Sequence, residues 1–459
     1  MKPLKVFLQI RKSELPLALL MSAYFLVIMT IFWVLKPLKK TLFIKRYDET
    51  GFSLLSWEMS AAQAELLAKG LNILVALLAV AAFTRLSRRF HRHSLTYIFT
   101  VFFLASFAFY AFILENPSAV TVWSFYLFGD LFSVLMVATF FAFLNDSVSP
   151  SAAKRMYGLV VLGGVLGGAL GSLVLLSRID SMQIQSWLWV CLGLGVVIVW
   201  IARMAGRVVD SHPEFALDDH SPETLASFSE TRSRNPLAES ARVVFSSSYF
   251  VCIAAIVFLY EIVSTCMDFQ FTSTIAHYLD GDAIGDQFKL VYAITNTVAV
   301  CVQLFLTSIV MTRASVKIAL LVTPIVALSG SAAFMVFPAL WVGSLLNTFD
   351  NGFNYSINQS ARESLYVPLR KVDKYKGKAF IDMFIQRFAK GVAILVTLFI
   401  THQFQDFSFL RWLSIFSIAV ITVWIVAASF AGRRFGELAR AKESQHAGQA
   451  READLPAGS

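Results

Sequence analysis

The sequence contains little charge for its length. Only 15% of its 459 residues are charged and 57% are hydrophobic, whereas charged residues make up roughly a quarter of a typical soluble domain. The mean hydropathy is +0.66. This shortage of charge excludes an ordinary soluble protein and predicts a protein that crosses a lipid bilayer many times.

Cysteine is also scarce, and the patterns of a metal or redox site are missing. The sequence has four cysteines, none of them in a CxxC motif, and all lie in apolar segments: Cys191, Cys252, Cys266 and Cys301. We interpret them as small packing residues rather than metal ligands or disulfide partners. Because no nucleophile–base pair or metal-ligand cluster is evident either, the sequence predicts neither an enzyme nor a cofactor.

A membrane-spanning helix needs about 20 mainly apolar residues. This rule predicts twelve spans, of which the first contains Pro37 and is expected to kink or break there. The spans are 15–44, 62–86, 94–114, 121–146, 156–176, 185–205, 248–277, 287–311, 316–336, 338–359, 379–402 and 409–431.

The distribution of basic residues predicts how the chain is oriented. The net charge of +9 does not indicate a nucleic-acid partner, because Lys and Arg in a membrane protein are counted loop by loop. Most of them fall in segments that are cytoplasmic if the N-terminus is inside. We therefore expect both termini in the cytoplasm. One group, at the end of the first span, lies on the predicted outer side: Lys36, Lys39, Lys40, Lys45 and Arg46.

The longest polar stretch divides the spans six and six. The predicted organisation is a cytoplasmic N-terminus (1–14), an N-terminal six-helix bundle (15–205), a cytoplasmic linker (206–247), a C-terminal six-helix bundle (248–431) and a partly disordered cytoplasmic tail (432–459). Two all-α, six-helix halves joined by a linker form the architecture of the major facilitator fold.

Ionisable residues occur within or at the edges of the predicted spans, where a charge costs several kcal/mol unless it meets a partner or a wet cavity. The acids are Asp130, Glu261, Asp268, Asp350 and Asp382, and the bases are Lys39, Lys69, Lys378, Arg387 and Lys390. Five acids and five bases allow a neutral network. Lys36 and Lys40 add positive charge, which would allow the network to receive a polyanion.

Two spans carry polar residues at helical spacing, so that each set shares one face. The first set is Glu261, Thr265, Asp268 and Thr272, and the second is Asn347, Asp350, Asn351, Asn354 and Asn358. Such faces either make interhelical hydrogen bonds or line water. We favour a water-lined path for the second set because of its length.

Several single residues allow two interpretations. Lys39 either extends to the membrane interface or faces a site. Asp130 either forms a salt bridge to another helix, for which Lys69 is a candidate, or acts as a cavity carboxylate that gates or carries a proton. Lys378 and Asp382 are four apart and could pair along one helix. In the fifth span, the spacing of Gly163, Gly167 and Gly171 predicts close helix packing, not a phosphate loop.

Four segments together resemble one family, the ATP:ADP antiporters or nucleotide transporters of plastids and intracellular bacteria. They are VLKPLKKTLFI at the end of the first span, the block from Trp123 through Asp130 to Gly158, YEIVSTCMDFQF in the seventh span, and NYSINQSARESLYVPLRKVDKYKGKAFID. The last is the strongest match. The resemblance covers roughly residues 15 to 430.

The resemblance implies residue roles. The two substrate-critical lysines of the family fall on Lys39 and Lys378, and its two functional glutamates fall on Asp130 and Asp268, one methylene shorter here. We therefore expect exchange of nucleotides by alternating access. In this hypothesis Lys39, Lys378 and Arg387 contact phosphates, while the acids act in gating or coupling. Asn347 and Asn354 are further candidates for substrate binding.

Two alternatives remain open. One is a proton-coupled carrier of another organic anion in the same fold, with Asp130 or Asp268 as proton carrier. The other is a non-transporting sensor or assembly component, in which salt bridges close off the polar faces. The predicted partners are a nucleotide or other phosphorylated anion and the lipid bilayer.

Overall fold

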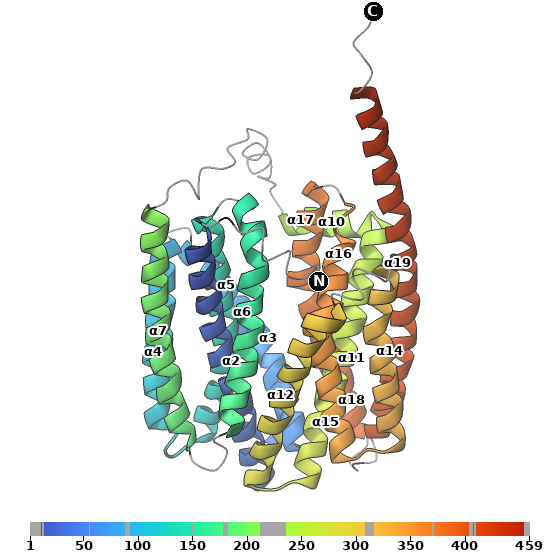
Figure 1. Ribbon diagram of the computed structural model, residues 1–459. Helices are drawn as coiled ribbons and strands as arrows, with labels where there is room; N and C mark the ends of the chain where they lie inside the picture. The colour runs from blue at the N-terminus through green and yellow to red at the C-terminus, as the bar shows by residue number, and fades with distance from the viewer. Residues whose placement is uncertain are drawn as a thin grey trace, which may run out of the picture. The chain divides into compact units, whose positions relative to one another are not determined.

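The computed structural model describes residues 11, 13–54, 56–87, 92–148, 150–177, 182–211, 236–307, 316–369, 371–403, 407 and 410–453. These residues are almost all helical (Figure 1). In a bilayer, backbone N–H and C=O groups find no water, so a long apolar segment satisfies them within its own helix. Eleven helices in the described residues are long and apolar enough to cross a membrane.

The first half of the chain contains α2 (Leu15–Thr50), α3 (Ala61–Ser87), α4 (Arg92–Ile113), α5 (Ala119–Ser147), α6 (Pro150–Ser177) and α7 (Ile184–Ser211). The α2–α3 connection forms a small antiparallel hairpin of β1 (Phe52–Leu54) and β2 (Trp57–Met59). Helix α2 continues through Pro37. Of the predicted kink or break at this proline, the break does not occur, and a kink stays a prediction.

The second half contains α10 (Pro236–Phe245), α11 (Ser248–Tyr278), α12 (Asp282–Cys301), α14 (Val316–Val336), α15 (Leu340–Phe353), α16 (Gln359–Leu365), α17 (Lys371–Phe380), α18 (Gln386–Gln403) and α19 (Leu410–Ala453). Three π-helical segments interrupt it: η1 (Val302–Thr307), η2 (Asn354–Asn358) and η3 (Ile381–Ile385). Such wider turns are rare and often occur at functional sites.

The predicted tenth span corresponds to α15, η2 and α16, which follow one another without a gap. None of the three alone is long enough to span a bilayer, but the predicted twelve spans remain consistent with this continuous stretch. The predicted linker contains a helix, α10. The predicted tail is helical as far as Ala453, where α19 ends, and residues 454–459 lie outside the described residues.

Contacts between residues divide the chain into two compact units. Unit 1 combines Met1–Leu225 with Thr272–Val300, and unit 2 combines Ala226–Phe271 with Cys301–Ser459. Helix α12 therefore belongs to unit 1. The boundaries of the two six-helix halves remain a prediction.

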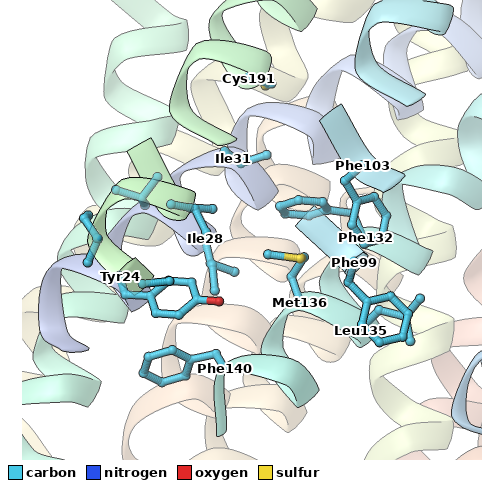
Figure 2. Close-up of a cluster of buried hydrophobic side chains, with 14 of the residues drawn as sticks. Tyr24, Ile28, Ile31, Phe99, Phe103, Phe132, Leu135, Met136, Phe140 and Cys191 are labelled. Carbon is cyan, nitrogen blue, oxygen red and sulfur yellow. The ribbon is translucent and has the colours of Figure 1, made fainter. Parts of the chain in front are cut away.

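The core of unit 1 is aromatic and surrounds α2. Figure 2 shows part of it, where side chains of α2, α4, α5 and α7 meet. The ring of Tyr24 meets the ring of Phe140 edge-on, with centroids 5.1 Å apart. Phe103 and Phe132 make a similar contact at 5.0 Å. The first contact packs α2 against α5, and the second packs α4 against α5. Helix α2 carries the lysines considered below.

Glycines allow α6 to approach α2 closely. A Cβ atom built on Gly163, Gly167 or Gly171 would overlap the backbone oxygen of Ser22, Leu26 or Thr30, respectively. Thr30 bonds across this contact, because its hydroxyl donates to the carbonyl of Gly167 at 3.1 Å. The prediction of close packing by this glycine face is confirmed.

Unit 2 is held together partly by polar contacts. Gln270 of α11 donates to the hydroxyl of Ser414 on α19 at 2.7 Å. Tyr260 and Trp424 join the same two helices, with ring centroids 5.6 Å apart. Cys266 is a buried free thiol with its sulfur 3.6 Å from the Thr397 hydroxyl, in keeping with its predicted packing role.

Candidate functional site

Lys39 lies on α2 and is buried, with only 5% of its side chain exposed. Its ammonium group forms an ion pair with Asp130 of α5. The same ammonium lies 4.4 Å from the centre of the Tyr126 ring and 3.5 Å from the carbonyl oxygen of Tyr126. Asn72 of α3 donates a hydrogen bond to Asp130. The predicted salt bridge of Asp130 to another helix is therefore present, and its partner is Lys39.

The neighbouring residue Gly129 makes room for this pair. A Cβ atom at Gly129 would lie 2.7 Å from Cδ of Lys39. The aliphatic part of the Lys39 side chain thus passes directly over the backbone of α5, where only glycine leaves enough space.

Glu65 of α3 is the centre of a second group in unit 1. It is fully buried, at 0% exposure. Its carboxylate lies 2.8 Å from the ammonium of Lys69 and 3.7 Å from that of Lys40, and it accepts a 2.6 Å hydrogen bond from the hydroxyl of Tyr126. Lys69, a candidate partner of Asp130 from the sequence, thus pairs with Glu65 one turn earlier on its own helix.

Aromatic residues of α12 lie against the remaining lysines of α2. The Lys36 ammonium is 4.4 Å from the centre of the Trp33 ring and 4.8 Å from that of Tyr292. The Lys40 ammonium is 5.2 Å from the ring of Phe288. Cation–π contacts stabilise a charge that has lost part of its hydration. They explain how these lysines are accommodated beside apolar residues.

In unit 2, Lys378 of α17 pairs with Glu363 of α16. Its ammonium lies 2.6 Å from both carboxylate oxygens and 5.8 Å from the centre of the Tyr366 ring. The side chains of Lys378 and Glu363 are 33% and 48% exposed. Lys378 thus pairs with Glu363 and not with Asp382, the possible partner four residues later, and the π-helical segment η3 begins between Lys378 and Asp382.

Two buried acids of unit 2, one on α11 and one on α15, are held by neutral donors and one lysine. Buried Glu261 accepts a 2.6 Å hydrogen bond from Gln386 and lies 3.5 Å from the ammonium of Lys390. Buried Asp350 accepts a 2.6 Å hydrogen bond from Ser264.

Amides of α15 and η2 contact one another and Asp268. Asn347 donates to the Asp268 carboxylate at 3.3 Å, and Asn358 donates to the side-chain oxygen of Asn354 at 2.9 Å. Part of the predicted polar face is therefore occupied by hydrogen bonds between side chains. Its predicted role in lining water stays a prediction.

Asp382 lies on η3 with an exposed side chain, and Arg387 lies one turn later on α18. The Nη1 atom of Arg387 is buried without a hydrogen-bond partner among the described residues. A buried guanidinium nitrogen with an unused donor is suited to an anion.

A further ion pair, apart from the lysine contacts described above, lies at the start of α2. Glu14 is buried and accepts hydrogen bonds from Nε of Arg155, at 3.1 Å, and from the backbone of Arg11, also at 3.1 Å. Burial by itself would raise the pKa of Glu14, but these hydrogen bonds and the charge of Arg155 outweigh it and lower the pKa below its usual value.

Sequence reasoning missed two of the central carboxylates, Glu65 and Glu363. Glu65 had a signal, because it lies within the predicted second span and four residues before Lys69. Glu363 lies outside every predicted span, in a segment expected to be a polar loop. Only the three-dimensional course of α16 and α17 shows that it meets Lys378.

The arrangement of the helices defines a class, that of membrane proteins with the major facilitator fold. The chain has the fold of the nucleoside transporter NupG, with a TM-score of 0.59, 11% identity and coverage of 90% of this chain and 98% of that one. It likewise has the fold of a D-xylose–proton symporter, with a TM-score of 0.58, 15% identity and coverage of 90% and 96%.

Sequence comparison places the chain within that class. The model of the TLC ATP/ADP transporter family matches residues 117–435, and the chain belongs to this family. ADP,ATP carrier protein 1 of Chlamydia muridarum is 23% identical over 364 residues, which are 70% of this chain and 66% of that one. The chloroplastic ADP,ATP carrier protein 2 of Arabidopsis thaliana is 22% identical, over 70% and 56%. ADP,ATP carrier protein 1 of Rickettsia conorii is 22% identical, over 80% and 85%. The chain thus spans about two thirds of the first of these relatives.

Proposed function

We propose that this protein exchanges nucleotides, ATP and ADP or closely similar phosphorylated anions, across a membrane by alternating access. Membership of the TLC family and the carrier names of its relatives support this proposal. The observation that carries it is the buried ion pair of Lys39 and Asp130 in unit 1. Lys39 is buried, whereas the side chain of its partner Asp130 is 28% exposed. A phosphate could therefore take the place of this carboxylate beside Lys39.

Each unit would supply basic side chains that bind the substrate. Lys39 in unit 1 and Lys378 in unit 2 would bind phosphate oxygens, with Arg387 as a third donor through its unused Nη1. Asn347 and Asn354 are further candidates for polar contacts to the substrate. None of these side chains performs covalent chemistry in this scheme, because transport requires only binding and release.

Carboxylates would hold these cations when the site is empty. Asp130 does so for Lys39. Asp268 is proposed to act similarly in unit 2, and Glu261, Asp350 and Asp382 to take part in gating or coupling. A substrate that displaces a carboxylate from its lysine changes the balance between the conformations of the carrier, since a ligand shifts an equilibrium through its differential affinity for the two states.

We propose further that the protein lies in the inner membrane of a bacterium with both termini in the cytoplasm. The excess of Lys and Arg on one side supports this orientation. The helices α10 and α17 and the C-terminal end of α19 would then be on the cytoplasmic side of unit 2.

Uptake into proteoliposomes tests the proposal. Purified protein is reconstituted, and uptake of labelled ATP is measured into vesicles loaded with ADP and into empty vesicles. Exchange predicts rapid uptake only into loaded vesicles. The alternative of a proton-coupled carrier has one observation in its favour, the buried Asp350 beside Ser264. It predicts uptake into empty vesicles when a pH gradient is imposed, and that result would contradict the exchange proposal.

A further inference from the structure

Glu65 is an acid inside a predicted membrane-spanning helix for which the proposed exchange gives no role. Its side chain is fully buried, and it lies between the ammonium groups of Lys69, at 2.8 Å, and Lys40, at 3.7 Å. Lys40 is itself buried, at 4% exposure, and the Lys69 side chain is 25% exposed. Ionised groups within membrane helices cost free energy and commonly mark functional sites. We therefore expect a function for this group.

Tyr126 joins this group to the Lys39–Asp130 pair. Its hydroxyl donates to Glu65 at 2.6 Å. Its ring lies 4.4 Å from the Lys39 ammonium, which also lies 3.5 Å from its carbonyl oxygen. The two carboxylates, Glu65 and Asp130, are therefore bound to lysines on the two sides of one tyrosine.

The two carboxylates mark two neighbouring places for anionic oxygens. In each place a carboxylate forms an ion pair with a lysine ammonium group. A phosphate group offers more oxygens and more negative charge to the same ammonium donors. A single phosphate group that displaces Asp130 from Lys39 leaves Glu65 with its two lysines. A chain of two or more phosphates can in addition displace Glu65 from Lys40 and Lys69.

We propose that Lys40 and Lys69 form a second phosphate subsite beside Lys39, and that Glu65 occupies this subsite when no substrate is bound. This subsite would receive the second phosphate of the ATP or ADP that the proposed function already names. This inference rests on the proposed nucleotide exchange and extends it, because it assigns the selection of phosphate number to unit 1. Tyr126 holds Glu65 in the subsite by its hydrogen bond when no substrate is bound.

Binding of two small anions to the purified full-length protein tests the subsite. The probes are pyrophosphate and orthophosphate, and the readout is the dissociation constant from ligand-dependent thermal stabilisation. We expect the wild type to bind pyrophosphate at least about tenfold more tightly than orthophosphate, which is the effect of one additional favourable contact of moderate strength. Equal affinity for the two anions would overturn the proposal.

Two substitutions are expected to act in opposite directions. Lys69→Gln removes one ammonium group and is expected to weaken pyrophosphate binding about tenfold while leaving orthophosphate binding unchanged. Glu65→Gln removes the competing charge but retains an oxygen for the Tyr126 hydroxyl, and is expected to tighten pyrophosphate binding several-fold. The matched control is Lys45→Gln, whose ion pair with Asp282 at 2.6 Å lies outside this group, and it is expected to change neither constant.

A third variant covers a failure of Glu65→Gln to fold. The double variant Glu65→Gln/Lys69→Gln removes one charge of each sign. Because Glu65 also competes at Lys40, the double variant is expected to bind pyrophosphate more tightly than Lys69→Gln does. Binding of pyrophosphate no tighter than in Lys69→Gln would overturn the proposal, as would an equal effect of Lys69→Gln on both anions.

The outcome is separable from that of the proposed function. If the protein exchanges nucleotides but the variants leave the preference for pyrophosphate unchanged, the subsite is wrong and the exchange stands. If it exchanges no nucleotide but its preference for pyrophosphate depends on Lys69, the subsite stands and the exchange is wrong.

Discussion

The two units hold their candidate lysines in different ways. Lys39 in unit 1 is 5% exposed, whereas Lys378 in unit 2 is 33% exposed and pairs with a glutamate that is 48% exposed. In unit 2 the buried charges are acids instead, namely Glu261 and Asp350, and their closest described donors include the neutral side chains of Gln386 and Ser264.

This difference indicates what a substrate must do in each unit. In the proposed scheme a phosphate would displace a carboxylate from Lys39, whose side chain is only 5% exposed, so binding in unit 1 would be tied to rearrangement. In unit 2 the lysine is partly hydrated and its ion pair contributes little energy, because exposed pairs are typically worth 0–1 kcal/mol. We therefore propose that Lys378 makes the first encounter with an anion, and that Lys39 acts in the step that changes conformation.

The largest expected effect is on stability at the two lysines. Lys39→Met leaves Asp130 without its charge partner and is expected to lower the free energy of unfolding by about 3 kcal/mol, because breaking a buried pair strands one charge. Lys378→Met is expected to cost less than about 1 kcal/mol. Thermal and denaturant unfolding in detergent measure both. Equal losses would remove the contrast between the units.

An intermediate effect is expected at the glycine beside Lys39. Gly129→Ala places a Cβ against Cδ of Lys39, and the resulting shift is expected to cost about 2 kcal/mol of stability and to weaken nucleotide binding. Gly193→Ala is the matched control, because a Cβ atom there has nothing within 4 Å. Nucleotide-dependent thermal shifts would show the difference. A wild-type response in Gly129→Ala would mean that the packing of Lys39 does not matter for its function.

The smallest effect is expected at Glu14, outside both clusters. Its pKa is lowered in the folded state, so its contribution is present above the unfolded-state pKa and is lost as the pH falls through the folded-state value. Glu14→Gln is expected to cost about 1 kcal/mol near neutral pH. The difference from wild type is expected to shrink below about pH 4.5 and to vanish once the pH is below the folded-state pKa. Unfolding curves across this range measure it. Slower nucleotide exchange by Glu14→Gln at neutral pH would contradict the expectation that Glu14 contributes to stability alone.

Much of the fold follows from the sequence because the bilayer leaves few choices. Long apolar runs must be helical, and the predicted spans overlap the observed helices closely. The departures have local causes. Helix α2 continues through Pro37. In the predicted linker, Pro236–Phe245 forms the helix α10, because an amphipathic segment can be helical beside a membrane without spanning it.

The candidate site was only partly predictable. Lys39, Asp130 and Lys378 stood out because charge is rare in apolar helices and because their segments resemble a family. Their partners were harder to identify. The pairing of Lys378 with Glu363 depends on how α16 and α17 are arranged and on the register change at η3. Helical spacing along one segment cannot supply either.

One measurement tests the proposed roles of Lys39 and Lys378 most directly. It is the exchange of labelled ATP for internal ADP by reconstituted wild-type protein and by the variants Lys39→Met and Lys378→Met. We predict rapid exchange by the wild type, and a loss of at least about a hundredfold in each variant, in keeping with the removal of a charged contact to phosphate. Exchange at the wild-type rate in either variant, with the protein folded and reconstituted in equal amount, would contradict the assignment of these lysines to the substrate.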